Sequence, residues 1–91
     1  MPIGFCKLKC EVEDGAFPHE KRVKIVTADG THYEAETAEQ YVQGGTVLVR
    51  PLREKGHHSL VEVPGGDVIV VEKSQLAPCH GGGKVNVPIQ S

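Results

Sequence analysis

The chain has 91 residues, 38% of them hydrophobic, and a net charge of −2, which indicates one small soluble domain. Proteins that bind nucleic acid through phosphate contacts are usually basic, so this charge disfavours a general nucleic-acid binder. No apolar run approaches the roughly 18 residues that span a bilayer, and the first ten residues lack the apolar core of a signal peptide. We therefore expect a cytoplasmic protein with no membrane partner.

The apolar residues are mainly Val and Ile, whose branching at Cβ suits a pleated strand better than a helix. The 11 Gly and six Pro residues supply turns between strands. We expect an all-β fold over residues 1–91, a single small and partly open barrel of about 5–7 antiparallel strands with a thin core.

The first half of the chain contains three predicted strands. Residues 5–13 alternate apolar and charged side chains, which predicts a half-buried strand. Lys21–Thr27 follows with Val23 and Ile25 pointing inward. Asp29–Gly30 has the composition of a tight hairpin turn and leads into Thr31–Glu36, where Tyr33 and Ala35 point inward. These expected inward residues form one half of the core.

The middle of the chain combines a helical turn with a strand. Thr37 and Gln40 have capping-box spacing, which predicts a helical turn over residues 38–43. The next strand is Thr46–Arg53. Pro51 cannot donate a hydrogen bond to a ladder, so this strand is predicted to be either an edge strand or bulged.

The last part of the chain begins with a strand over residues 59–63 and a turn over residues 64–67. Val68–Glu72 is the most apolar segment and is predicted to be the central strand. A short 3₁₀ turn is expected near residues 73–76, with Leu76 closing one barrel end. Beyond it we expect a glycine hinge at residues 81–83 and a C-terminal strand at residues 84–89.

The segment Val70-Val71-Glu72-Lys73-Ser74-Gln75-Leu76 resembles the end of SH3-like barrels, where a strand gives way to a 3₁₀ turn. The stretch from Val12 to Glu20 is similar to small uncharacterised bacterial all-β proteins. The resemblance covers roughly residues 21–89 and implies an SH3-like barrel, to which the strand 5–13 is an addition. The chain lacks Trp and an acidic–aromatic cluster, so proline-peptide recognition is not implied.

Three cysteines and their neighbours are candidates for chemistry. Cys6 and Cys10 lie four residues apart on a predicted strand, about 13 Å, which is too far to share a metal or a disulfide. We interpret both as small buried apolar residues. Cys79–His80 lies in a loop and is the alternative candidate for a thiol or metal site, with no cofactor implied. The chain has no Gly-x-Ser-x-Gly motif, and we do not expect an enzyme.

The preferred interpretation is a non-enzymatic interaction module that binds a protein through an exposed strand edge. The edge-like segments are residues 84–91 and the strand marked by Pro51. Exchange of the C-terminal tail between two copies could form a homodimer. The candidate binding residues are Phe17, Tyr33, Tyr41, Arg50 and Arg53. The alternative is a weak RNA-binding barrel, in which the tyrosines stack on bases and the basic residues are Lys21, Arg22, Lys24, Arg50 and Arg53.

Overall fold

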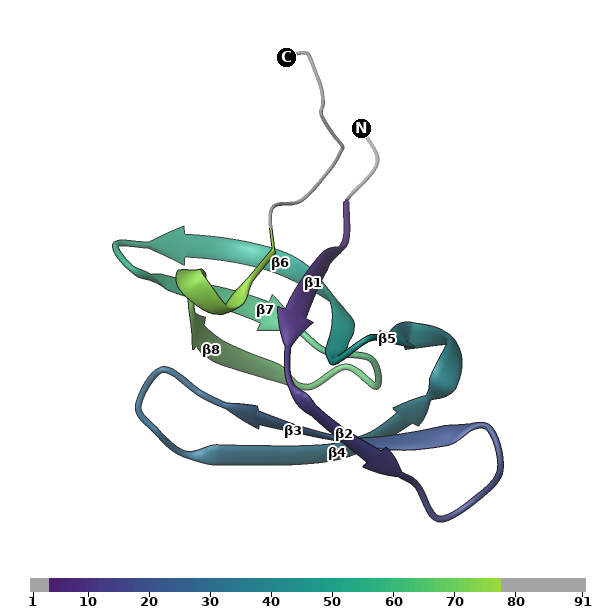
Figure 1. Ribbon diagram of the computed structural model, residues 1–91. Helices are drawn as coiled ribbons and strands as arrows, with labels where there is room; N and C mark the ends of the chain where they lie inside the picture. The colour runs from purple at the N-terminus through teal and green to yellow at the C-terminus, as the bar shows by residue number, and fades with distance from the viewer. Residues whose placement is uncertain (1–3, 78–91) are drawn as a thin grey trace.

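The computed structural model describes residues 4–77, and this part of the chain is all-β, with eight antiparallel strands in two sheets and two short 3₁₀ helices (Figure 1). The larger sheet has the order β1-β6-β7-β8, and β5 also pairs with β6. Its strands are β1 (Cys6–Lys9), β5 (Val42–Gln43), β6 (Thr46–Lys55), β7 (His58–Glu62) and β8 (Val68–Glu72). The smaller sheet has the order β2-β3-β4, formed by β2 (Glu11–Asp14), β3 (Glu20–Val26) and β4 (His32–Ala38).

The core lies between the two sheets and is rich in Val, as the composition predicts. Its buried apolar residues come from both sheets: Cys6, Leu8, Val23, Ile25, Val47, Val49, Val61, Val63 and Val71. Helix η2 (Lys73–Gln75) follows β8 and confirms the predicted 3₁₀ turn. Leu76 then packs against the core and forms an antiparallel bridge with Leu8. The C-terminal end of the described chain is thereby attached to β1.

The predicted N-terminal strand is divided into β1 and β2, which belong to different sheets. The division falls at Cys10, whose N–H donates to the Gly45 carbonyl at 2.9 Å, the next position in the β1–β6 register, before the chain enters β2. Val12 pairs with the buried Val23, but β2 is exposed along its length and Val12 is exposed with it. The alternation of apolar and charged side chains continues unchanged where the chain crosses from one sheet to the other. The crossing therefore cannot be predicted from the alternation.

The β3–β4 hairpin agrees with its prediction. Val23 and Ile25 are buried, and Tyr33 and Ala35 pack partly buried against the core. Gly30 has φ = 87° in the turn, a conformation that glycine adopts without a steric penalty. Local alternation and turn chemistry are sufficient to specify this hairpin.

The predicted helical turn over residues 38–43 is shorter than expected. Helix η1 spans Glu39–Tyr41, its N-cap is Ala38, and no side chain caps it, so the predicted capping box does not form. Thr37 is instead buried on β4. The chain then enters β5 rather than extending the helix.

The predictions for the positions of β6 and β8 have different outcomes. Strand β6 pairs with β1 and β5 through its first half and with β7 through its second half, which contains Pro51. The alternative prediction, a bulge, is confirmed by a register shift between Pro51 and Arg53, where a missing backbone donor is tolerated. Strand β8 was predicted to be central, but it is the last strand of the larger sheet. The predicted hinge 81–83 and strand 84–89 lie outside the described residues.

Candidate binding site

The last strands of the two sheets, β4 and β8, lie close together, and we call the space between them the β4–β8 seam. The Ala28 N–H donates to the Val70 carbonyl at 2.8 Å, and the Tyr33 hydroxyl donates to Asp67 Oδ2 at 2.7 Å. Figure 1 shows β8 beside the β3–β4 hairpin. Neither strand pairs with a further strand among residues 4–77. These two hydrogen bonds join sheet edges that no strand ladder connects.

A cavity of about 500 Å³ opens at this seam. Its lining includes Ala28, Asp29, His32, Tyr33, Ile69 and Val70. Ile69 and Val70 supply apolar walls. The rings of Tyr33 and His32 combine apolar faces with polar atoms. The cavity is larger than the hollow of about 280 Å³ beside Tyr41. It can therefore accommodate side chains as well as a backbone.

The backbone of β4 points unpaired groups toward the outer edge of its sheet. The Thr27 N–H donates to the Thr31 carbonyl at 2.8 Å, which identifies a hydrogen-bonded pair of the β3–β4 ladder. Because such pairs alternate along an antiparallel ladder, the backbone groups of His32, Glu34 and Glu36 point away from β3. This edge is available for a further strand.

The backbone of β8 shows the corresponding arrangement. The Val70 carbonyl faces away from β7 because it accepts the Ala28 N–H, and the same alternation turns the backbone groups of Val68 outward. At the far end of β8, the Glu72 N–H is already bound by Gln75 Oε1 at 2.9 Å. The open groups of this edge are therefore the N–H and carbonyl of Val68 and the N–H of Val70.

Polar contacts fix the ends of the seam. Burial, together with the hydrogen bond to Asp67, raises the pKa of Tyr33 to about 12, so the phenol keeps its proton and continues to donate at neutral pH. In the hairpin turn, hydrogen bonds from the Thr27 hydroxyl and from Thr31 lower the pKa of Asp29 to about 2. At neutral pH Tyr33 is therefore neutral and Asp29 is ionised, and both keep the hydrogen bonds that position them at the seam.

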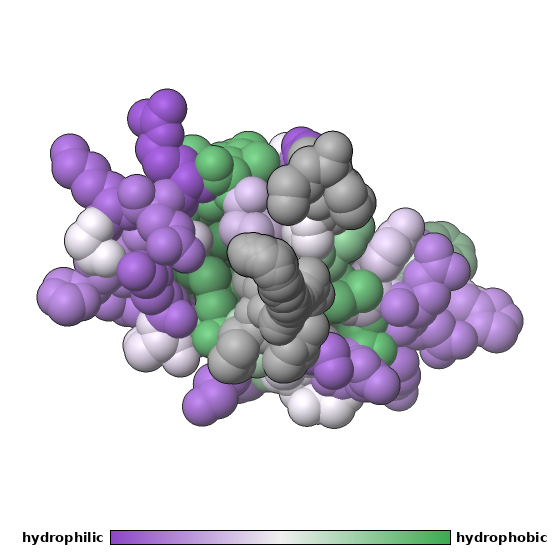
Figure 2. Space-filling view, turned by 90° about the horizontal axis from the view of Figure 1, so that it is seen from above, coloured by the Kyte–Doolittle hydropathy of each residue, from purple (hydrophilic) through white to green (hydrophobic). Residues whose placement is uncertain are grey.

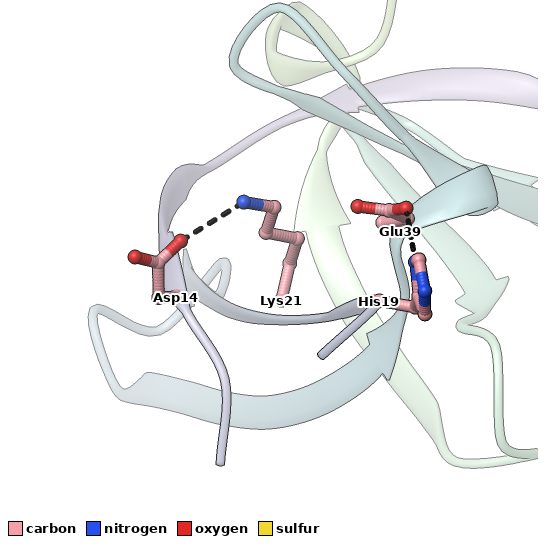
Figure 3. A network of polar contacts seen from close by, with 4 residues as sticks. All are labelled: Asp14, His19, Lys21 and Glu39. Atoms are coloured by element: carbon pink, nitrogen blue, oxygen red, sulfur yellow. Dashed lines mark hydrogen bonds and ion pairs between the residues drawn. The ribbon is translucent and has the colours of Figure 1, made fainter. Parts of the chain in front are cut away.

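Ion pairs join neighbouring strands of the smaller sheet, on its outer surface for Arg22 and Lys24 and on the opposite side for Lys21. Lys21 Nζ lies 2.9 Å from Asp14 Oδ1, and Lys24 Nζ lies 2.9 Å from Glu13 Oε2. Arg22 Nη2 lies 3.1 Å from Glu36 Oε2. Figure 3 shows the Lys21–Asp14 pair and, nearby, His19 against Glu39. These basic residues, predicted for RNA binding, already have carboxylate partners.

The outer face of the larger sheet has a different composition. The strand register places three cross-strand rows on it, which are Arg50–Glu62–Val68, Arg53–Leu60–Val70 and Lys55–His58–Glu72. Arg50 Nε donates to Glu62 Oε1 at 2.9 Å. We call the surface formed by these three rows the outer face. It combines exposed apolar side chains with basic side chains.

The five predicted binding residues do not form one site. Arg50 and Arg53 share the outer face, and Tyr41 and Arg50 line a hollow of about 280 Å³ beside it. Tyr33 lies at the seam. Phe17 follows β2 in a loop and is 69% exposed. The structure thus divides the predicted set among separate surfaces.

Several residues of these surfaces were missed by the sequence analysis. Phe5 and Leu48 line the same hollow as Tyr41, and Leu60, Val68 and Val70 lie on the outer face. The available signal was the continuous apolar run of β8, which places apolar side chains on both faces of a strand. Apolar side chains on both faces of a strand need cover on both faces. In β8 the core covers only the inner face.

The described part of the chain offers little for metal binding. Residues 4–77 contain no group of three or more His, Cys, Asp or Glu side chains that could hold a metal ion. Cys10 is a free cysteine, and burial raises its pKa to about 11, which disfavours the reactive thiolate. The predicted alternative site at Cys79 and His80 lies outside the described residues.

No helix within residues 4–77 is both long and apolar enough to cross a membrane. Comparisons with protein-family models, curated proteins and solved structures give no match.

Proposed function

We propose that the protein is a non-enzymatic module that binds a protein partner by strand addition at the β4–β8 seam. The observation that carries this proposal is the pair of sheet edges, β4 and β8, that border one cavity and point unpaired backbone groups outward. Peptide binding at a sheet edge obtains affinity from main-chain hydrogen bonds and specificity from pockets for alternate side chains.

The partner is a segment of extended polypeptide. In an extended chain, successive N–H groups point to opposite sides, so one set can bond to β8 and the other set to β4. The apolar wall formed by Ile69 and Val70 suits an apolar side chain from the added strand. His32 and the acidic Glu34 border the other side, where a basic or neutral polar side chain fits better than an acidic one.

The test begins with a peptide selected from a random displayed library on the full-length protein. N-methylation of alternate amides removes their hydrogen bonds without changing side chains. We expect methylation of either alternate set to raise Kd about tenfold or more, since each lost backbone bond costs about 0.5–1.5 kcal/mol. A selection in which no peptide depends on either alternate set of amides would reject the proposal.

A matched pair of proline variants locates the binding edge. Val70→Pro removes an N–H that faces the seam. Val12→Pro removes an N–H that faces outward on β2, because the Gly15–Glu20 hydrogen bond makes Val12–Val23 a non-bonded pair of its ladder. Both prolines are at edge positions that tolerate them, and circular dichroism checks the fold. We expect only Val70→Pro to abolish peptide binding.

We also propose that the two sheets form one partly open barrel of the SH3-like type. Three features support this finer fold assignment. The chain passes between sheets at Cys10, η2 follows the last strand of the larger sheet, and Leu76 returns to pair with Leu8 of β1. A solution structure in which β4 and β8 are far apart would contradict the assignment.

Nucleic-acid binding is the less supported alternative. Lys21, Arg22 and Lys24 are bound to carboxylates, so each would have to leave its partner before it could contact a phosphate. The net charge of −2 adds a general repulsion. Homodimer formation through residues 84–91 rests on a segment outside the described residues, and a thiol or metal site at Cys79 does as well.

A further inference from the structure

The outer face of the larger sheet carries apolar side chains that the fold does not cover. Val68 is 50% exposed and Val70 is 40% exposed, although both belong to the most apolar strand of the protein. Their cross-strand neighbour Leu60 is half-buried on the same face. Inner-face packing does not require these side chains, because Ile69 and Val71 of β8 already face the core. Such a surface is typical of an interaction site.

Two hollows give this face a shape. One, of about 200 Å³, is lined by Arg53, Lys55, His58, Leu60 and Val70. The other, of about 280 Å³, includes Phe5, Tyr41, Leu48 and the Arg50–Glu62 pair. Figure 2 shows hydrophobic surface between hydrophilic surfaces at two opposite ends of the molecule. Each hollow combines apolar walls with a basic side chain.

The charges around the outer face are mainly positive. Arg53 and Lys55 belong to its rows, and Lys7 stands beside Leu48 in the register of β1 and β6. None of these three cations forms an ion pair within residues 4–77. The carboxylates of the face are already bound, since Glu62 pairs with Arg50 and Glu72 lies 3.2 Å from His58 Nε2. The unpaired charge is therefore cationic.

We infer that the outer face binds a second partner surface, a protein segment that combines apolar and acidic side chains. Apolar residues of that segment cover Leu60, Val68 and Val70, and its carboxylates pair with Arg53 and Lys55. This site shares Val70 with the β4–β8 seam but binds in a different way, because the outer face acts through side chains whereas strand addition acts through the backbone. Charge complementarity of this kind sets both the choice of partner and the rate of encounter.

The test uses two displayed peptide libraries on the full-length protein. One is restricted to Asp, Glu and apolar residues, and the other has Lys and Arg in place of Asp and Glu. We expect enrichment from the acidic library alone, with affinity that falls as salt rises. Because outer-face binding does not use peptide amides, N-methylation leaves it within about twofold of the unmodified Kd, well below a tenfold change. Equal enrichment from the two libraries, or from neither, would overturn the inference.

Variants then place the selected acidic peptide on the outer face. Arg53→Glu should raise its Kd at least about tenfold, while Lys24→Glu, the same charge change on the smaller sheet, should leave it nearly unchanged. Leu60→Ala tests the apolar contact, with Val12→Ala as its control on β2. Arg53→Gln removes the charge without reversing it, so a result remains available if Arg53→Glu fails to fold. Equal losses for Arg53→Glu and Lys24→Glu would contradict the assignment.

Discussion

The smaller and the larger sheet use their outward surfaces in different ways, although both bury an inner face in the same core. On the smaller sheet, basic residues of β3 pair with acidic residues of β2 and β4, so the sheet satisfies its own surface charges. On the larger sheet, Val68 and Val70 are exposed beside cations that lack partners among residues 4–77. This difference is the basis of our proposal that a partner covers the second surface.

The shared core gives the largest expected effect. Leu8 of the larger sheet and Ile25 of the smaller sheet are both essentially buried. Replacement of either by Ala should lower the free energy of unfolding by about 2–5 kcal/mol, because a cavity replaces packed methyl groups. Urea denaturation followed by circular dichroism measures the loss, with Lys7→Ala as a surface control. Two separate unfolding transitions would show that the sheets are independent units, contrary to the structure.

The crossing point between the sheets provides a chemical measure of their packing. Burial raises the pKa of Cys10 from 9.0 to about 11, so its thiolate is scarcer in the folded protein. We expect alkylation of Cys10 near neutral pH to be about a hundredfold slower in the folded protein than in urea, since only the thiolate reacts. Mass spectrometry of the Cys10 peptide measures the rate. A folded-state rate close to the rate in urea would mean that the sheets separate readily at this point.

The same raised pKa of Cys10 sets a direction for stability at high pH. The neutral thiol is favoured in the folded state, so its contribution is fully present below the unfolded pKa of 9.0. That contribution is lost as the pH rises through the folded value of about 11. Cys10→Ser removes this pH dependence and serves as the control for the alkylation experiment.

Local parts of this fold could be predicted from sequence, whereas contacts between distant segments could not. The β3–β4 hairpin needed only alternation around Val23 and Ile25 and the Asp29–Gly30 turn, and its pairing agrees. The crossing at Cys10 comes where the pairing of β1 with β6 ends, and β6 lies far away in the sequence. Alternation does not change at such a crossing, so one strand was predicted where two occur.

The candidate site shows the same limit. The run Val68–Val71 indicates burial on both faces. A sequence does not say whether the other sheet or a partner covers each face. Arg50 and Arg53 fall on one face only because the bulge after Pro51 shifts the register by one residue. Without that bulge, two residues three positions apart on a strand would face opposite sides. The seam joins two hairpins, and no local pattern predicts it.

Acid gives the smallest effect and separates the two sheets most directly. On the smaller sheet, the pKa of Glu13 is lowered by its hydrogen bond to Lys24, and the pKa of Glu36 by its hydrogen bond to Arg22. The adjacent turn holds Asp29, whose pKa is lowered to about 2. A lowered folded pKa contributes stability above the unfolded pKa, and that stability is lost as the pH falls through the folded value.

We therefore expect acidification from about pH 5 to pH 2 to loosen the smaller sheet first, by a modest amount because these carboxylates are solvent-exposed. Amide hydrogen exchange, measured residue by residue, should accelerate in β2, β3 and β4 before it does in β7 and β8. Asp29→Asn should remove the part of this loss that occurs nearest pH 2, because its side-chain oxygen still accepts the bonds from Thr27 and Thr31 but no longer titrates. If β7 and β8 exchange faster first, the ion pairs between strands do not hold the smaller sheet together, and the contrast between the two outward surfaces loses its energetic basis.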